Sequence, residues 1–244
     1  MSASSLAWAQ FRLERKLFWR NPSAAFFNFG LPLLLLVLVA SVFASEADEL
    51  DVLIPGVAGM SVMATTFNAM AYNVTFRREQ GLLKRALTTP VPLGSYFAGF
   101  LGNAVANAFV QVGLVVVIGH LAFGVRWPAD WAELVVFTTV GVASFGSLGI
   151  AVSQFIPNFD STAAYVNLIF LPAIFISGVF YSTDSLPAAL DFVARGLPLK
   201  HVIDGLSGAI VTGAGLEDNA GALGVVAAWG LVGVVLAVRN FRWE

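Results

Sequence analysis

The chain has 244 residues, of which 58% are hydrophobic and 11% charged, and its formal net charge is -2. An ordinary soluble domain carries about 25% charged residues, so this composition indicates an integral membrane protein and excludes most water-soluble enzymes. The small net charge gives no overall attraction for nucleic acid. Cysteine is absent, which rules out disulfides, thiolate metal sites and cysteine nucleophiles.

Residues 4–20 form the first predicted element, an amphipathic helix that lies along the membrane interface. Its basic residues are expected to face anionic headgroups, although Arg15 interrupts the apolar face. A basic flank that only orients the first membrane span is the alternative. The apolar face consists of Ala7, Trp8, Phe11, Phe18 and Trp19.

Charge-free runs predict the membrane spans, because a charge at mid-bilayer costs roughly 3 kcal/mol or more. Each run holds the roughly 20 residues that a helix needs to cross a ~30 Å hydrocarbon layer. The first run is too long for a signal peptide. The prediction is therefore an all-α membrane protein with one domain over residues 1–244 and six transmembrane helices. The runs are residues 21–45, 52–76, 86–125, 134–159, 161–183 and 219–238.

The charged residues divide between the two sides of the predicted membrane. With six spans, most basic residues lie on the side of the termini, and most acids lie on the other side. The positive-inside rule then predicts a multi-pass protein of the cell membrane with both termini in the cytoplasm. The basic residues on that side are Arg12, Arg15, Lys16, Arg20, Arg77, Arg78, Lys84, Arg85, Arg239 and Arg242.

The cytoplasmic loop of residues 76–92 has the sequence FRREQGLLKRALTTPVP. Its charges alternate with leucines, which predicts a short helix with an apolar ridge, ended by Thr88, Thr89 and Pro90. A short helix at the membrane surface can dock into the groove of a partner. A solvated connector that only obeys the positive-inside rule is the alternative. The ridge consists of Leu82, Leu83, Ala86 and Leu87.

Polar and aromatic side chains within the spans are candidates for a substrate path. Asn103, Asn107 and Gln111 share one helix face with small residues, and this face either lines a path or packs against a neighbouring helix. The same two readings apply to four further asparagines, and three phenylalanines can stack on a flat amphipathic substrate. These residues are Asn28, Asn68, Asn73 and Asn167, and Phe29, Phe170 and Phe175. Pro32 and Pro172 are expected to kink the first and fifth spans.

The external segment of residues 182–218 is too interrupted by charges to be another span. Two short re-entrant helices are expected there. The first begins with Ser185 as N-cap and Pro187 in its first turn, and Gly196 and Pro198 end it. The second covers residues 200–210. A surface loop without a role in transport is the alternative.

Two motifs resemble the type 2 ABC exporter permeases. The first, EQGLLKR at residues 79–85 followed by Thr89-Pro90, is similar to the cytoplasmic coupling loop of that family. The second runs from Pro172 through residues 176–181 (ISGVFY) and 185–187 to 197–199 and 203–204. The chain departs from the family pattern at Ser182, where proline is common, and at Ser207 and Gly208, where a basic residue is common.

The resemblance covers nearly the whole chain and implies the permease subunit of an ATP-driven exporter. It is closest to short members that export drugs or antibiotics, with an amphipathic or lipid-linked cargo. Permeases for polysaccharides or glycolipids are the alternative. The resemblance also implies two separate ATPase subunits, which hold ATP and magnesium, and a second permease copy or paralogue. The residues implied to couple to the ATPases are Arg77, Arg78, Glu79, Gly81, Leu82, Leu83, Lys84 and Arg85.

Other function classes fit the sequence less well. The chain has no GxxxxGK[ST] or GxGxxG motif, so we expect no ATPase site, no cofactor and no metal site in this chain. An ion-coupled secondary transporter needs ionisable groups inside its spans, and the predicted spans have none beyond their ends. An intramembrane hydrolase around Ser147 lacks a nearby base, since His120 and His201 fall at predicted external ends.

Overall fold

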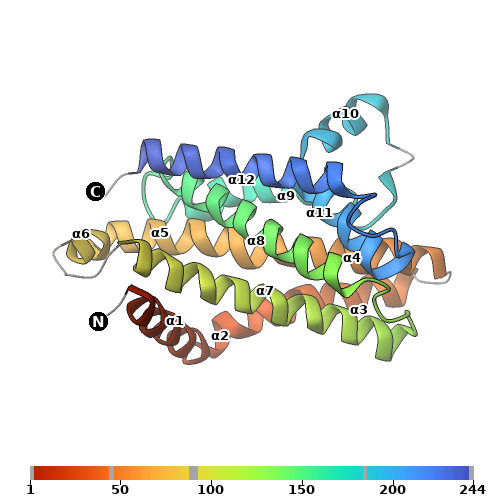
Figure 1. Cartoon of the computed structure of the whole chain (residues 1–244), viewed down its shortest axis with the longest axis horizontal. Helices are drawn as coiled ribbons and strands as arrows, with labels where there is room; N and C mark the ends of the chain where they lie inside the picture. The colour runs from red at the N-terminus through yellow and green to blue at the C-terminus, as the bar shows by residue number, and fades with distance from the viewer. Residues whose placement is uncertain (1–2, 44–46, 88–92, 184–185, 242–244) are drawn as a thin grey trace.

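The computed structural model describes residues 3–43, 47–87, 93–183 and 186–241, and every regular element in these ranges is a helix (Figure 1). The α-helices run close to one long axis, and three π-helical turns (η) interrupt them. In chain order the elements are α1 (Ala3–Trp19), α2 (Pro22–Ala25), η1 (Phe26–Gly30), α3 (Leu31–Phe43), α4 (Ala47–Met63), η2 (Ala64–Asn68), α5 (Ala69–Glu79), α6 (Leu82–Leu87), α7 (Leu93–Phe123), α8 (Trp131–Ser153), α9 (Thr162–Ile176), α10 (Ala188–Gly196), α11 (Pro198–Ser207), η4 (Gly208–Thr212) and α12 (Ala220–Asn240).

A continuous helix made of α4, η2 and α5 lies at the centre of the bundle. Helices α3, α7, α8 and α11 pack around it. Its apolar side chains are buried on all sides, for example Val57, Phe67 and Met70. A helix that is apolar all round is stable only when other helices or lipid surround it, and here other helices do.

Close helix packing depends on glycine at several contacts. A Cβ atom added to Gly149 of α8 would collide with the Phe67 carbonyl oxygen and lie 2.9 Å from the Met70 Cβ atom. The missing side chain therefore lets α8 approach η2 and α5 directly. Such approach of two backbones gives the van der Waals contact that holds helices together in lipid.

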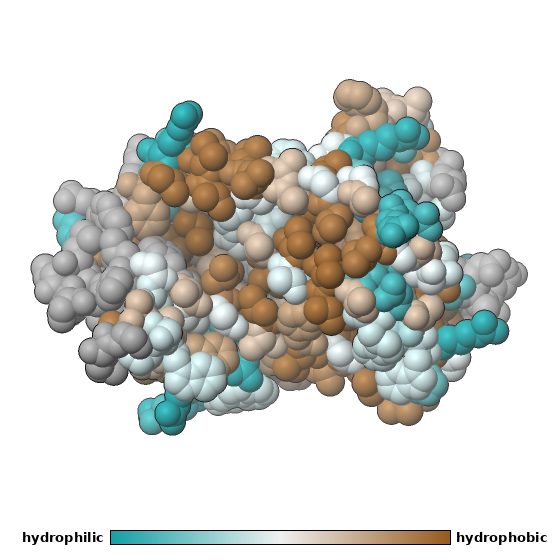
Figure 2. Space-filling model, viewed as in Figure 1, coloured by the Kyte–Doolittle hydropathy of each residue, from teal (hydrophilic) through white to brown (hydrophobic). Residues whose placement is uncertain are grey.

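The structure confirms a membrane protein with several spans. Four of the described helices are long and apolar enough to cross a bilayer: Glu49–Glu79, Ala98–Phe123, Trp131–Ser153 and Ala220–Asn240. Two shorter apolar helices, Phe26–Val42 and Thr162–Ile176, lie in the expected first and fifth spans. Figure 2 shows hydrophobic surface across the middle of one face and hydrophilic residues toward both ends. The count of six spans stays a prediction.

Several predicted span boundaries are wrong. The fifth span was expected to reach residue 183, but α9 ends at Ile176 because Gly178 adopts φ 77°, which a helix cannot continue through. The fourth predicted span ends with α8 at Ser153 instead of residue 159. The third predicted span, residues 86–125, begins within α6 and continues in α7.

The predicted first span is not one regular helix. The π turn η1 precedes Pro32, whose missing amide hydrogen cannot bond to the Asn28 carbonyl four residues earlier. Pro172 lies inside α9 and Pro55 inside α4. The local sequence therefore accounts for the break at the start of the first span.

Two short helices follow the fifth span, as expected, but their starts differ. Helix α10 has Pro187 at its N-cap position, and Ser185, the predicted N-cap, lies outside the described residues. Helix α11 begins two residues before the predicted Lys200, with Pro198 in the first turn, where its missing amide hydrogen costs nothing. Leu199, Val202 and Leu206 bury α11 against α4, α8 and α12. That α10 and α11 re-enter the membrane stays a prediction.

We expect Gly149→Ala to lower the free energy of unfolding in detergent by about 1–3 kcal/mol, because the added methyl group overpacks the contact of α8 with η2. Gly113→Ala is the matched control, since an added Cβ there has no neighbour within 4 Å. Circular dichroism during denaturant unfolding measures both variants. Equal stability of Gly149→Ala and the wild type would contradict the packing described.

Candidate coupling site

The last turn of α5 carries three consecutive polar residues, Arg77, Arg78 and Glu79. Successive residues of an α-helix point about 100° apart, so the three side chains reach three different neighbours. These neighbours are α1, the end of α8, and the loop between α8 and α9. The end of α5 is therefore tied to each element beside it.

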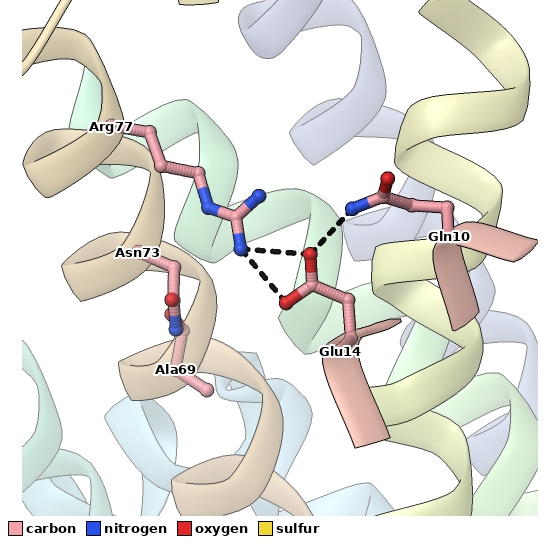
Figure 3. A network of polar contacts seen from close by, with 5 residues as sticks. All are labelled: Gln10, Glu14, Ala69, Asn73 and Arg77. Atoms are coloured by element: carbon pink, nitrogen blue, oxygen red, sulfur yellow. Dashed lines mark hydrogen bonds and ion pairs between the residues drawn. The ribbon is translucent and has the colours of Figure 1, made fainter. Parts of the chain in front are cut away.

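Arg77 forms an ion pair with Glu14 of α1 (Figure 3). Its Nη2 atom donates to Glu14 Oε2 at 2.8 Å and to Oε1 at 2.9 Å, and Gln10 Nε2 also donates to Oε1 at 2.6 Å. Only 13% of the Arg77 side chain and 7% of the Glu14 side chain are exposed. The Arg77 guanidinium also lies 4.7 Å from the ring centre of Phe100 in α7. One arginine thus joins α5, α1 and α7.

Arg78 binds the C-terminal end of α8. It is buried and donates to the Ser153 carbonyl at 2.9 Å and to the Ile156 carbonyl. Carbonyls at the end of a helix have no donor within the helix and carry partial negative charge. Arg78 therefore satisfies these carbonyls and neutralises the end of α8.

Glu79 holds the loop of residues 154–161. Its Oε2 atom accepts a hydrogen bond from the Phe159 amide at 2.6 Å. The Phe159 ring in turn contacts the rings of Tyr72 and Phe76 on α5. Polar and aromatic contacts together attach the loop to the same helix end.

Helix α6 follows α5 after a sharp turn at Gly81, whose φ of 65° is left-handed and disfavours any side chain. Leu83 is buried in a cluster with Met70, Val74, Phe100 and Ala104. Leu82, Lys84 and Arg85 are exposed. The turn and the buried leucine therefore give α6 one fixed side and one outward side.

The short helix expected in the loop of residues 76–92 is confirmed as α6, and its coupling role stays a prediction. The residues implied to couple divide into two groups. Arg78 and Leu83 are buried within the chain, and Arg77 is largely so. These residues hold α6 in place and do not face outward. Residues 88–92, which were expected to end the helix, lie outside the described part of the chain.

Helix α1 packs along the first half of α7. Ser95 Oγ donates to the Ala3 carbonyl, and a Cβ atom on Gly99 would lie 2.7 Å from the Ala7 carbonyl oxygen. Arg15, which interrupts the expected apolar face, does not face headgroups but donates to Asn107 Oδ1 of α7. The bundle offers Arg15 a polar partner at hydrogen-bond distance, which accounts for the difference. The helix itself is confirmed, and its interfacial position stays a prediction.

The α7 residues considered for a substrate path make packing contacts. Asn107 accepts from Arg15, and Gln111 Nε2 donates to the Phe29 carbonyl at 3.4 Å. Asn73 donates to the Ala69 carbonyl of its own helix at 2.8 Å. These contacts within one chain are of the kind that the packing alternative expects.

The remaining path candidates share no hydrogen bond with one another in the described part of the chain. Asn28, Asn68 and Asn103 each have one buried polar atom without a hydrogen bond to a described residue. On α9, Asn167 and Phe175 are exposed, and Phe170 is half-buried. In the described part of the chain, the bond from Gln111 to Phe29 is the only hydrogen bond that joins two of the ten candidates.

Comparison with known proteins places these features in a family. The family model described as "ABC-2 type transporter" matches residues 5–211, from α1 to the last π turn, and so includes the coupling site. The chain belongs to the ABC-2 type transporter family.

Two of three curated relatives of this ABC-2 permease carry transport names. The linearmycin resistance permease protein LnrN of Bacillus subtilis is 23% identical over 198 residues, 81% of this chain and 51% of LnrN. Nodulation protein J of Rhizobium meliloti is 31% identical over 149 residues, 61% of this chain and 56% of that protein. The inner membrane transport permease YadH of Escherichia coli is 25% identical over 153 residues, 63% of this chain and 59% of YadH. The chain thus spans only about half the length of these relatives.

The ion pair in this ABC-2 permease can be tested by neutralising each partner. We expect Glu14→Gln and Arg77→Gln each to lower the free energy of unfolding by about 2 kcal/mol, because each leaves a desolvated partner with weaker hydrogen bonds. The double variant should lose less than the sum of the two. Lys16→Gln, an exposed charge on the same helix, is the control and should change little. Additive losses would contradict a direct pair.

Proposed function

We propose that this chain is the membrane subunit of an ATP-driven exporter and that separate ATPase subunits deliver their work to α6. The observation that carries the proposal is the two-sided construction of α6. Leu82, Lys84 and Arg85 face outward at one end of the bundle, while Leu83 anchors the opposite side of the same helix. An exposed apolar residue flanked by basic residues is a suitable docking surface for a protein groove.

The proposed mechanism follows the contacts of α5. When the ATPases close, they displace α6, and the short turn at Gly81 passes this motion to α5. Arg77 then carries it to α1 and α7, and Arg78 and Glu79 carry it to α8 and the loop before α9. Packed helices shift as rigid bodies, so the paired permeases change which side is open.

The proposed assembly contains two ATPases and two permeases. ATP and magnesium belong to the ATPase subunits, because this chain has no phosphate-binding loop. The second permease is a copy of this chain or a paralogue. We further propose the cell membrane as the location, with α6, the beginning of α1 and the end of α12 on the cytoplasmic side. These three lie at the same end of the bundle (Figure 1).

The proposed cargo is an amphipathic drug-like or lipid-linked molecule. The name of LnrN, a linearmycin resistance permease, supports a drug-like cargo. An exporter of polysaccharide or glycolipid is the other candidate, since the same coupling-loop motif is found in those permeases. Cargo moved by an ion gradient without ATP would instead identify a secondary transporter.

The docking surface can be tested with Lys84→Glu combined with Arg85→Glu. We expect association with the ATPase subunits, and ATP-dependent transport in inverted membrane vesicles, to fall about tenfold or more, because two attractive charges become repulsive. Both side chains are exposed, and insertion and folding of the variant are compared with those of the wild type.

Arg239→Glu is the control for this test, since it reverses an exposed charge at the same end of the bundle, on α12. It should leave association and transport unchanged. Wild-type association of the Lys84→Glu/Arg85→Glu variant, or transport driven by a proton gradient without ATP, would overturn the proposal.

A further inference from the structure

A polar cavity lies at the end of the bundle opposite α6, between the start of α4, the turn after α9, and α11. Its volume is about 210 Å³, the volume of roughly seven waters at about 30 Å³ each. Sites for whole drug-sized molecules measure about 300–1,000 Å³. The cavity can therefore hold a polar headgroup but not an entire cargo molecule.

The lining of the cavity carries more negative than positive charge. Lys200 Nζ lies 2.9 Å from Asp204 Oδ1 and 3.1 Å from Oδ2, so these two charges compensate one another. Asp51 of α4 also lines the cavity, and no described residue forms an ion pair with it. The cavity thus presents one uncompensated carboxylate.

Two further hydrogen-bond acceptors belong to residues that line the same cavity. Pro55 lines the cavity and cannot donate to the Asp51 carbonyl, which therefore lacks its usual helical partner. Ser177, which is 1% exposed, also lines the cavity, and its Oγ atom has no hydrogen bond to any described residue. A buried polar atom without a partner is rare in a folded protein and calls for a ligand or water.

The cavity is also held open by its backbone. Gly178 adopts φ 77° in the turn after α9, and a Cβ atom on Gly56 would collide with the Val179 carbonyl. The turn after α9 therefore contacts the backbone of α4 directly. This contact keeps Ser177 at the same end of the bundle as Asp51.

We propose that this cavity binds the primary ammonium group of an amphipathic amine. A primary ammonium has three hydrogen-bond donors and one positive charge, which match the Asp51 carboxylate, the Asp51 carbonyl and Ser177 Oγ. A divalent cation fits less well, because hard cations need six or more oxygens, and the described residues include no group of three metal-binding side chains. The amine belongs either to a cargo molecule or to a lipid headgroup.

The site deepens the proposed function, because it names a chemical class for the cargo and rests on the export proposal only for that role. Binding itself needs no ATPase. A failure of amine binding would leave ATP-driven export intact, and a failure of coupling at α6 would leave amine binding intact.

The test uses the whole chain, purified in dodecyl maltoside, and measures fluorescence anisotropy of dansylcadaverine, a primary amine. Dansylglycine carries the same fluorophore on an anion. We expect the amine to bind at least about tenfold more tightly than the anion, and Asp51→Asn to weaken amine binding about tenfold. Ser177→Ala should weaken it severalfold without loss of stability, because the hydroxyl has no partner in the fold.

Asp191→Asn on α10 is the control, because it removes one negative charge at the same end of the bundle but outside the cavity lining. It should leave amine binding unchanged. Equal affinity for both probes, or wild-type amine binding by folded Asp51→Asn, would overturn the assignment. Nanodiscs then separate the two sources. Competition by phosphatidylethanolamine, but not by phosphatidylglycerol, identifies a lipid headgroup, and its absence identifies a free amphipathic amine.

Discussion

The structure depends on one constraint, which is that the charges of Arg77 and Arg78 at the end of α5 must be satisfied where packed helices exclude water. The Arg77 guanidinium pairs with the Glu14 carboxylate, and Arg78 donates to the Ser153 carbonyl at the end of α8. The exposed Glu79 carboxylate accepts a hydrogen bond from the Phe159 amide. The bonds of Arg77 and Arg78 would be costly to break, because each would leave a desolvated group alone. Arg77 and Arg78 therefore attach the end of α5 to α1, α7 and the end of α8, and α6 follows directly from this joint.

The same central helix links the two ends of the molecule. One continuous helix, Glu49–Glu79, carries Asp51 at the polar cavity and Arg77 to Glu79 at the coupling site. Between them lies the π turn η2, where the hydroxyls of Thr65 and Thr66 donate to carbonyls of the preceding turn. One helix therefore connects α6 to the cavity, and the π turn η2 is the irregular turn between them.

The sequence predicts the helices better than their contacts. Charge-free runs locate the helices because lipid excludes unpaired charge, and the alternation of leucine with basic residues locates α6. Helix ends are less predictable, since a single backbone angle at Gly178 ends α9 several residues early. The roles of Glu14 and Arg78 are invisible in the pattern because their partners are 63 and 75 residues away. The single acid in a basic, apolar first helix was the available signal for the ion pair.

The distance between α1 and the start of α6 can be measured directly. The chain has no cysteine, so spin labels attach only to cysteines introduced by mutation. Labels at Arg12→Cys on α1 and Gln80→Cys, in the turn that leads into α6, occupy exposed positions and leave the docking surface of Leu82, Lys84 and Arg85 intact. Double electron–electron resonance then compares the complex with its ATPases without nucleotide and with a non-hydrolysable ATP analogue. We predict one narrow distance distribution that is the same in both states. A distribution that broadens or shifts when nucleotide binds would show that α6 moves independently of α1 and would contradict the account.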